Sequence, residues 1–83
     1  MKSPATYHLC YCGLLADRRG LAEERLSHPA TTAAELYDSL AAAHHLGLAR
    51  TDLWVAVNDV IVPWNHPLND GDLIVLLPPM SGG

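Results

Sequence analysis

The chain has 83 residues, of which 49% are hydrophobic and 17% charged, a composition that favours one small folded domain over a disordered segment. The formal net charge is −4 with only five Lys and Arg residues, so the chain lacks the basic surface that binds nucleic acid. No apolar run approaches the ~20 residues of a membrane span, and "MKSPATYHLC" has no signal-peptide pattern. We therefore expect a cytoplasmic protein with neither nucleic acid nor membrane as a partner.

The first third of the chain contains two predicted strands. The apolar run "YHLCYCGLL" (residues 7–15) suits a pleated surface and has the length of a strand. A polar turn at residues 17–20 follows, and "LAEERLS" (residues 21–27) fits either an edge strand or a helical turn, of which we favour the strand. Cys10 and Cys12 would share one face of the first strand as buried or half-buried thiols, and without a second cysteine cluster no metal site is expected.

The middle of the chain predicts one helix. Thr32 and Glu35 have the spacing of a capping box, and small and apolar residues then recur at helical intervals up to Ala43. Pro29 marks where the preceding strand has ended, and Gly47 is expected to stop the helix.

The last third predicts a hairpin and a central strand. Strands at residues 53–57 and 60–62 would be joined at Asn58 and Asp59, which both tolerate a positive φ. After a turn at residues 69–72, "LIVLL" (residues 73–77) is apolar on both faces, as in an interior strand. The element order predicts an α+β roll: a mixed four- to five-stranded sheet with the first and last strands adjacent and one main helix packed on one face. The other face would be solvated or covered by a partner, and the apolar last strand favours a partner.

Side chains that could catalyse a reaction are scarce. The sequence contains no nucleophile elbow, no glycine-rich phosphate loop and no HExxH motif. Adjacent His44 and His45 would diverge on a helix, so they are interpreted as solvated residues at its end. His66 and Asp72 form only a weak acid-base hypothesis, and Trp64 would either cap the edge of the core or join a contact surface.

The final residues form a different kind of candidate. Pro78 and Pro79 cannot continue a sheet ladder, so we divide the chain into a domain of residues 1–77 and an extended, flexible tail of residues 78–83. Met80, Ser81, Gly82 and Gly83 lack bulk near the end, which would let the α-carboxylate enter a narrow active site after activation as an anhydride. From composition alone, a frayed end remains the alternative.

Residues 55–83 resemble a known family. "VAVN", "HPLNDGD" and the terminal "PPMSGG" are similar in sequence and spacing to the small subunit of molybdopterin synthase, the MoaD-type sulfur carrier with a β-grasp, ubiquitin-like fold. The resemblance covers essentially the chain, more weakly over residues 20–52. It implies that Gly83 is adenylated by a ubiquitin-activating-like adenylyltransferase that uses ATP, and is then converted to a thiocarboxylate.

The resemblance also implies a partner and its contact residues. The sulfur would pass to a pyranopterin precursor inside the large subunit, in a heterotetramer whose catalytic side chains belong to that subunit, and the carrier itself would bind no cofactor. Contact positions carried over from the family are Cys12, Ile61 and Leu77. Other interpretations remain: a sulfur carrier for the thiamin thiazole, a ubiquitin-like protein modifier, and a plain interaction module with an irrelevant tail. Pro78 and Pro79, with the chain length, favour the molybdopterin pathway.

Overall fold

The computed structural model describes residues 4–78. Within that range no helix combines the length and apolarity needed to cross a bilayer. The elements in chain order are β1 (Ala5–Tyr11), α1 (Leu14–Arg19), β2 (Glu23–His28), α2 (Ala33–His44), the 3-10 helix η1 (Arg50–Asp52), β3 (Trp54–Val57), β4 (Val60–Val62) and β5 (Leu73–Leu77).

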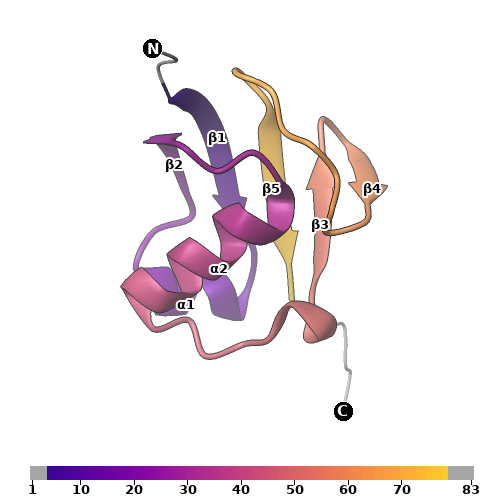
Figure 1. The fold of residues 1–83 in the computed structure, drawn as a ribbon. Coiled ribbons are helices and arrows are strands. Elements are labelled where there is room, and N and C mark those ends of the chain that lie inside the picture. Colours follow the sequence, from indigo (N-terminus) through magenta and orange to yellow (C-terminus); the bar gives the residue numbers. More distant parts are fainter. Residues whose placement is uncertain (1–3, 79–83) are drawn as a thin grey trace.

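The five strands form one mixed sheet in the order β2-β1-β5-β3-β4. β1 and β5 run parallel, whereas β1–β2, β3–β4 and β3–β5 are antiparallel pairs. Helix α2 crosses one face of this sheet (Figure 1). The predicted α+β architecture is therefore confirmed, including the adjacent first and last strands and the main helix on one face.

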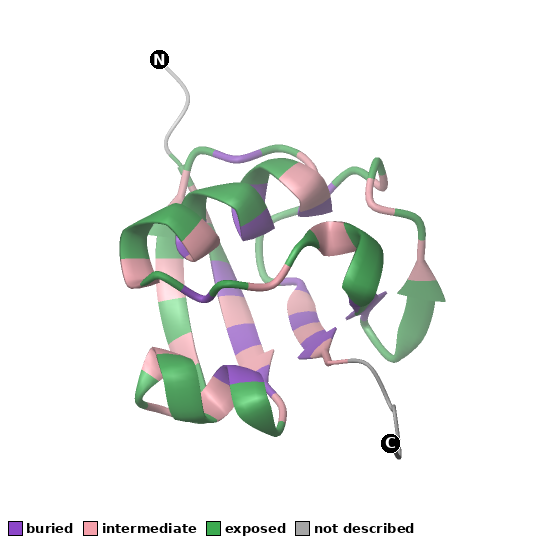
Figure 2. Ribbon diagram, turned by 90° about the horizontal axis from the view of Figure 1, so that it is seen from below, coloured by how far each residue is buried: buried purple, intermediate pink, exposed green. Residues whose placement is uncertain are grey.

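The hydrophobic core lies between α2 and the sheet. Buried and half-buried positions alternate along β1 and β5 (Figure 2), because successive side chains of a strand point to opposite faces. Leu9, Ile74 and Leu76 are each at most 1% exposed. Side chains from the helices complete this core, including Leu15 of α1 and Leu36 and Leu40 of α2, together with Leu46 from the loop after α2.

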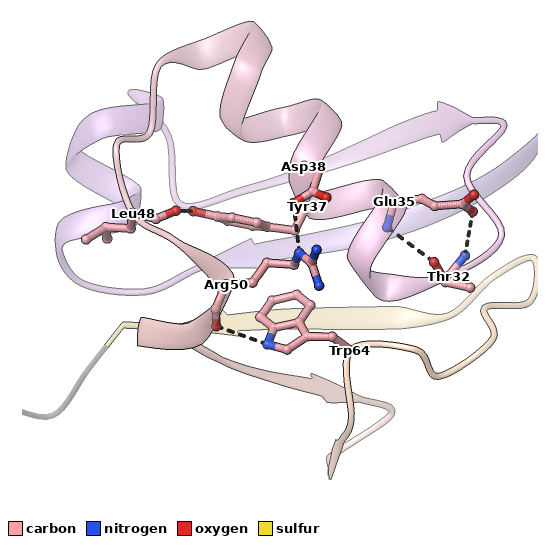
Figure 3. Close-up of polar contacts among 7 residues, drawn as sticks. All are labelled: Thr32, Glu35, Tyr37, Asp38, Leu48, Arg50 and Trp64. Carbon is pink, nitrogen blue, oxygen red and sulfur yellow. Dashed lines mark hydrogen bonds and ion pairs between the residues drawn. The ribbon is translucent and has the colours of Figure 1, made fainter.

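Helix α2 begins as the sequence predicts and ends earlier. The Thr32 side chain accepts a hydrogen bond from the backbone N–H of Glu35, and the Glu35 carboxylate accepts one from the N–H of Thr32, so the capping box is present (Figure 3). The expected stop at Gly47 is wrong. His45 already adopts a left-handed conformation (φ 52°) and donates its N–H to the Ala41 carbonyl, which ends the helix at His44.

The prediction of a strand over residues 7–15 is correct only as far as Tyr11. Gly13 has φ 54°, which turns the chain out of the sheet, and Leu14 then begins the short helix α1. The predicted turn at residues 17–20 is the last part of α1 and its Gly20 cap, whose N–H bonds to the Ala16 carbonyl. Leu15 of this helix is completely buried in the core.

The favoured strand after this turn is confirmed as β2, and an ion pair ties it to α1. The Arg19 guanidinium donates to both carboxylate oxygens of Glu24 at 3.0 and 2.8 Å, and the Tyr11 hydroxyl donates to the same carboxylate at 2.7 Å. Arg19 and Glu24 are 18% and 17% exposed, so solvent screens this pair less than it would a fully exposed one.

The loops beside α2 are held by two aromatic side chains (Figure 3). The Tyr37 hydroxyl donates to the Leu48 carbonyl at 2.6 Å, and the Trp64 indole N–H donates to the Arg50 carbonyl at 3.1 Å. The two rings lie 5.5 Å apart, and Asp38 accepts a hydrogen bond from the Arg50 guanidinium. Trp64 therefore packs at the edge of the core, the first of the two roles expected for it.

Candidate functional site

The sheet face opposite α2 carries exposed apolar side chains at its β5–β3–β4 end. Leu77 of β5 is half-buried, and Trp54 of β3 lies directly opposite it in the strand register. Ile61 of β4 lies opposite Ala56 on the same face. Trp54 and Ile61 are 58% and 55% exposed, a high exposure for large apolar residues in a domain this small.

These side chains line a shallow hollow of about 470 Å³. We call it the open-face hollow, and its lining residues are Cys12, Gly13, Trp54, Ile61, Leu77 and Pro78. The structure thus brings together all three contact positions carried over from the family, Cys12, Ile61 and Leu77. Their role as an interface stays a prediction. The sequence analysis did not single out Trp54, although alternation along residues 53–57 separates it from Val55 and Val57.

The carboxyl end of β5 lies at the rim of this hollow. The Cys12 backbone N–H bonds to the Leu76 carbonyl at 3.3 Å, which holds the β1–α1 turn against β5. A Cβ atom on Gly13 would lie 3.4 Å from Pro78 Cγ. The turn therefore lies beside Pro78, and Gly13 and Pro78 both line the hollow.

Most of the predicted tail lies outside the described residues. This applies to Pro79, Met80, Ser81, Gly82 and Gly83, so the role expected of the Gly83 carboxylate and the division into residues 1–77 and 78–83 stay predictions. Only Pro78 is described, and it is half-buried directly after the last residue of β5.

The described residues give no support to the acid-base pair of His66 and Asp72. Asp72 is 8% exposed, and its two carboxylate oxygens accept hydrogen bonds from the Asn58 side chain at 2.9 Å and the Asn69 backbone at 2.8 Å. Asp72 therefore ties the β3–β4 hairpin to the turn before β5. Among residues 4–78, no buried side-chain nitrogen or oxygen lacks a hydrogen-bond partner.

The two cysteines are free, half-buried thiols, as predicted. Burial raises the pKa of the Cys10 thiol, and the nearby Glu23 carboxylate and Cys12 raise it further. Cys10 consequently stays protonated at neutral pH in the absence of a cation, and a protonated thiol is a poor nucleophile.

A comparison with known protein families shows to which family this chain belongs. The sequence profile of the ThiS family matches residues 10–83, which is nearly the whole chain. The chain belongs to the ThiS family. This assignment confirms the relationship that the sequence motifs indicated, and the match reaches across both the open-face hollow and the terminal glycines.

Relatives of this ThiS-family chain agree with the assignment. The molybdopterin synthase sulfur carrier subunit of Escherichia coli is 45% identical over 38 residues, which are 46% of this chain and 47% of that protein. The match thus spans about half the length of the curated relative.

Two solved structures share the fold. SAMP1 from Haloferax volcanii superposes with a TM-score of 0.77 at 22% identity, covering 95% of this chain and all of that one. Subunits 1 and 2 of the molybdopterin-converting factor from Helicobacter pylori form a protein-protein complex, and the similar chain in it has a TM-score of 0.65 at 28% identity, covering 94% and 99% of the two chains. The β-grasp fold expected from the sequence is confirmed.

Proposed function

We propose that this protein is the sulfur-carrier subunit of a molybdopterin synthase. In this role the Gly83 carboxylate is adenylated at the expense of ATP, and sulfide displaces AMP to leave a C-terminal thiocarboxylate. The thiocarboxylate then donates its sulfur to a pyranopterin precursor bound by the large subunit. The observation that carries the proposal is the 45% identity to the Escherichia coli sulfur carrier subunit.

The position of the open-face hollow supports a docking role for this face. Apolar side chains at the carboxyl end of β5 lie directly beside Pro78, where the chain continues toward Gly83. The five residues after Pro78 span at most about 18 Å when fully extended. A partner that uses the terminal carboxylate must therefore place its active site close to this end of the sheet, and covering the hollow would achieve that.

Intact-protein mass measurement tests the carrier role. The protein is incubated with ATP, a ubiquitin-activating-like adenylyltransferase and a sulfur donor, and we expect a mass increase that corresponds to one oxygen replaced by sulfur. Addition of the large subunit and the pyranopterin precursor should then discharge the thiocarboxylate and yield the dithiolene product.

Two variants locate the reaction. Deletion of Gly83 should abolish thiocarboxylate formation and sulfur transfer, because the remaining terminus is one residue shorter than the partner's site requires. Ser81→Ala keeps both terminal glycines and serves as the matched control, which should behave as the wild type. Sulfur transfer by the deletion variant at the wild-type rate would refute the carrier role.

The ThiS family match supports one second candidate, a sulfur carrier for the thiamin thiazole. This candidate shares the thiocarboxylate and differs in the acceptor. To distinguish the two candidates, the thiocarboxylated protein is incubated separately with a thiazole-forming synthase and with a molybdopterin synthase large subunit. Only the enzyme of the true pathway should consume the thiocarboxylate rapidly. Covalent adducts with lysines of other proteins would instead indicate a ubiquitin-like modifier.

A further inference from the structure

Three potential metal ligands meet on the open sheet face, at the opposite end from β4. His8 and Cys10 are two residues apart on β1, so both side chains point away from the core. Glu23 of β2 lies directly opposite Cys10 in the antiparallel register. One ligand atom from each of the three residues lies within 4.8 Å of the other two.

We propose that His8, Cys10 and Glu23 form a binding site for a divalent zinc ion. The ligands would be a ring nitrogen of His8, the Cys10 sulfur and a Glu23 carboxylate oxygen, with water in the fourth position. This site is independent of the proposed function, which involves no metal on the carrier.

The distances suit tetrahedral coordination after a small adjustment. Zinc binds nitrogen and oxygen at about 2.0 Å and sulfur at about 2.3 Å, which places ligand atoms about 3.5 Å from one another. His8 Nε2 and Glu23 Oε1 are already 3.2 Å apart. The strand pairing fixes the backbone positions of the three residues, and rotation about side-chain bonds would bring their ligand atoms, which lie within 4.8 Å of one another, to this spacing.

The charges of the site also balance. The Cys10 thiol loses its proton to solvent as the sulfur binds the ion, while neutral His8 and the Glu23 carboxylate donate lone pairs. One thiolate and one carboxylate then neutralise the two positive charges of zinc.

The exposure of the site leaves room for a fourth ligand. The side chains of His8 and Glu23 are 39% and 65% exposed, so water reaches the ion from the open side. Three protein ligands with a solvent position are the pattern of an open zinc site, whereas structural zinc sites use four protein ligands. The sequence analysis expected no metal site because it rested on Cys10 and Cys12 alone. The strand pairing that places Glu23 opposite Cys10 is not visible in the sequence.

Titration of the untagged, reduced protein with Co²⁺ tests the proposal directly, because a cobalt–thiolate bond gives a charge-transfer absorption band. We expect one equivalent of Co²⁺ to bind with that band and with the strong visible absorption of tetrahedral cobalt, and Zn²⁺ to displace it. Cys10→Ser should abolish the charge-transfer band, and His8→Gln and Glu23→Gln should each weaken binding by at least ~10-fold.

Cys12→Ser is the matched control, because Cys12 is the other half-buried thiol at the same end of the chain. This variant should leave both the charge-transfer band and the affinity for Co²⁺ unchanged. Circular dichroism establishes that each variant remains folded, and any variant that fails is replaced by Cys10→Ala, His8→Asn or Glu23→Ala. The proposal is overturned if the wild type binds no Co²⁺ at equimolar concentration, if Cys12→Ser rather than Cys10→Ser removes the band, or if the ion binds only between two copies of the chain.

Discussion

The most informative test of the open-face hollow is a negative charge at Ile61. Replacing this residue with Asp puts a carboxylate in the lining of the open-face hollow, the surface that we propose to cover with the large subunit. The matched control is Val60→Asp on the same edge strand. Val60 is 60% exposed, close to the 55% of Ile61, but it lies opposite core-facing Val57 and so points to the other face of the sheet.

The expected loss of binding follows from the exposed part of Ile61. Full burial of an isoleucine side chain contributes about 1.5–3 kcal/mol, and since just over half of Ile61 is still exposed, covering it contributes about 1–1.5 kcal/mol. An aspartate without a partner in the interface costs at least ~1 kcal/mol more. Ile61→Asp should therefore weaken binding by at least ~2 kcal/mol, which is about 30-fold in Kd.

Binding and stability are measured separately for both variants. Isothermal titration with the large subunit should show the loss for Ile61→Asp and a nearly unchanged Kd for Val60→Asp. Thermal unfolding should show similar small decreases for the two, because each loses one β-branched residue, worth up to ~1 kcal/mol, from an edge strand. Equal Kd values for the two variants would refute the assignment of the interface to this face.

Three further predictions concern the fold, and urea unfolding measures all of them. Ile74→Ala should lower the free energy of unfolding by about 2–5 kcal/mol, because the removed atoms leave a cavity in the core; a loss under 1 kcal/mol would contradict the burial of Ile74. Thr32→Ala should lower the free energy of unfolding by about 1 kcal/mol, because the helix cap is lost. An unchanged free energy of unfolding would contradict a stabilising role of this cap. Burial alone would raise the pKa of Glu24, but hydrogen bonds from Arg19 and Tyr11 outweigh it and lower the pKa below its ordinary value of 4.5. The ionised carboxylate therefore stabilises the fold above about pH 4.5, and this contribution is lost as the pH falls through the lowered pKa. Glu24→Gln should flatten that acidic decline, and an identical decline in both proteins would exclude this carboxylate as its source.

Local signals in the sequence predicted the elements that depend on neighbouring residues. The capping box of Thr32 and Glu35 fixes the start of α2, because both hydrogen bonds form within one turn. The hairpin between β3 and β4 was likewise predictable, since Asn58 and Asp59 adopt the positive φ values of 51° and 73° that a tight turn needs.

Helix α1 shows where such signals compete. The apolar run continues from β1 into Leu14 and Leu15, so periodicity alone could not separate a strand from a helix. Gly20 in the left-handed conformation and Arg18 and Arg19 in the last turn are the signals of a helix end. In the structure Leu15 is fully buried in the core. This packing against the rest of the domain is a tertiary contact, which the local sequence does not reveal.

The candidate sites depend on pairing between distant strands. The family resemblance selected Cys12, Ile61 and Leu77, of which Ile61 and Leu77 lie in strands and Cys12 lies in the turn after β1. Their common hollow exists only because β5 pairs with β3 and the β1–α1 turn packs on Pro78. The cluster of His8, Cys10 and Glu23 likewise requires the β1–β2 register, which residue patterns do not specify.

The central position of β5 has a consequence for how the chain folds. β1 pairs with β2 and β3 pairs with β4, but these two hairpins share no strand pairing until β5 enters between β1 and β3. During synthesis the two halves of the sheet must therefore wait for β5, whose pairing with β1 joins residues more than sixty positions apart. Contacts of such long range slow folding. The hollow beside Pro78 thus forms only after β5 has been made, so an incompletely translated chain cannot offer this surface to a partner.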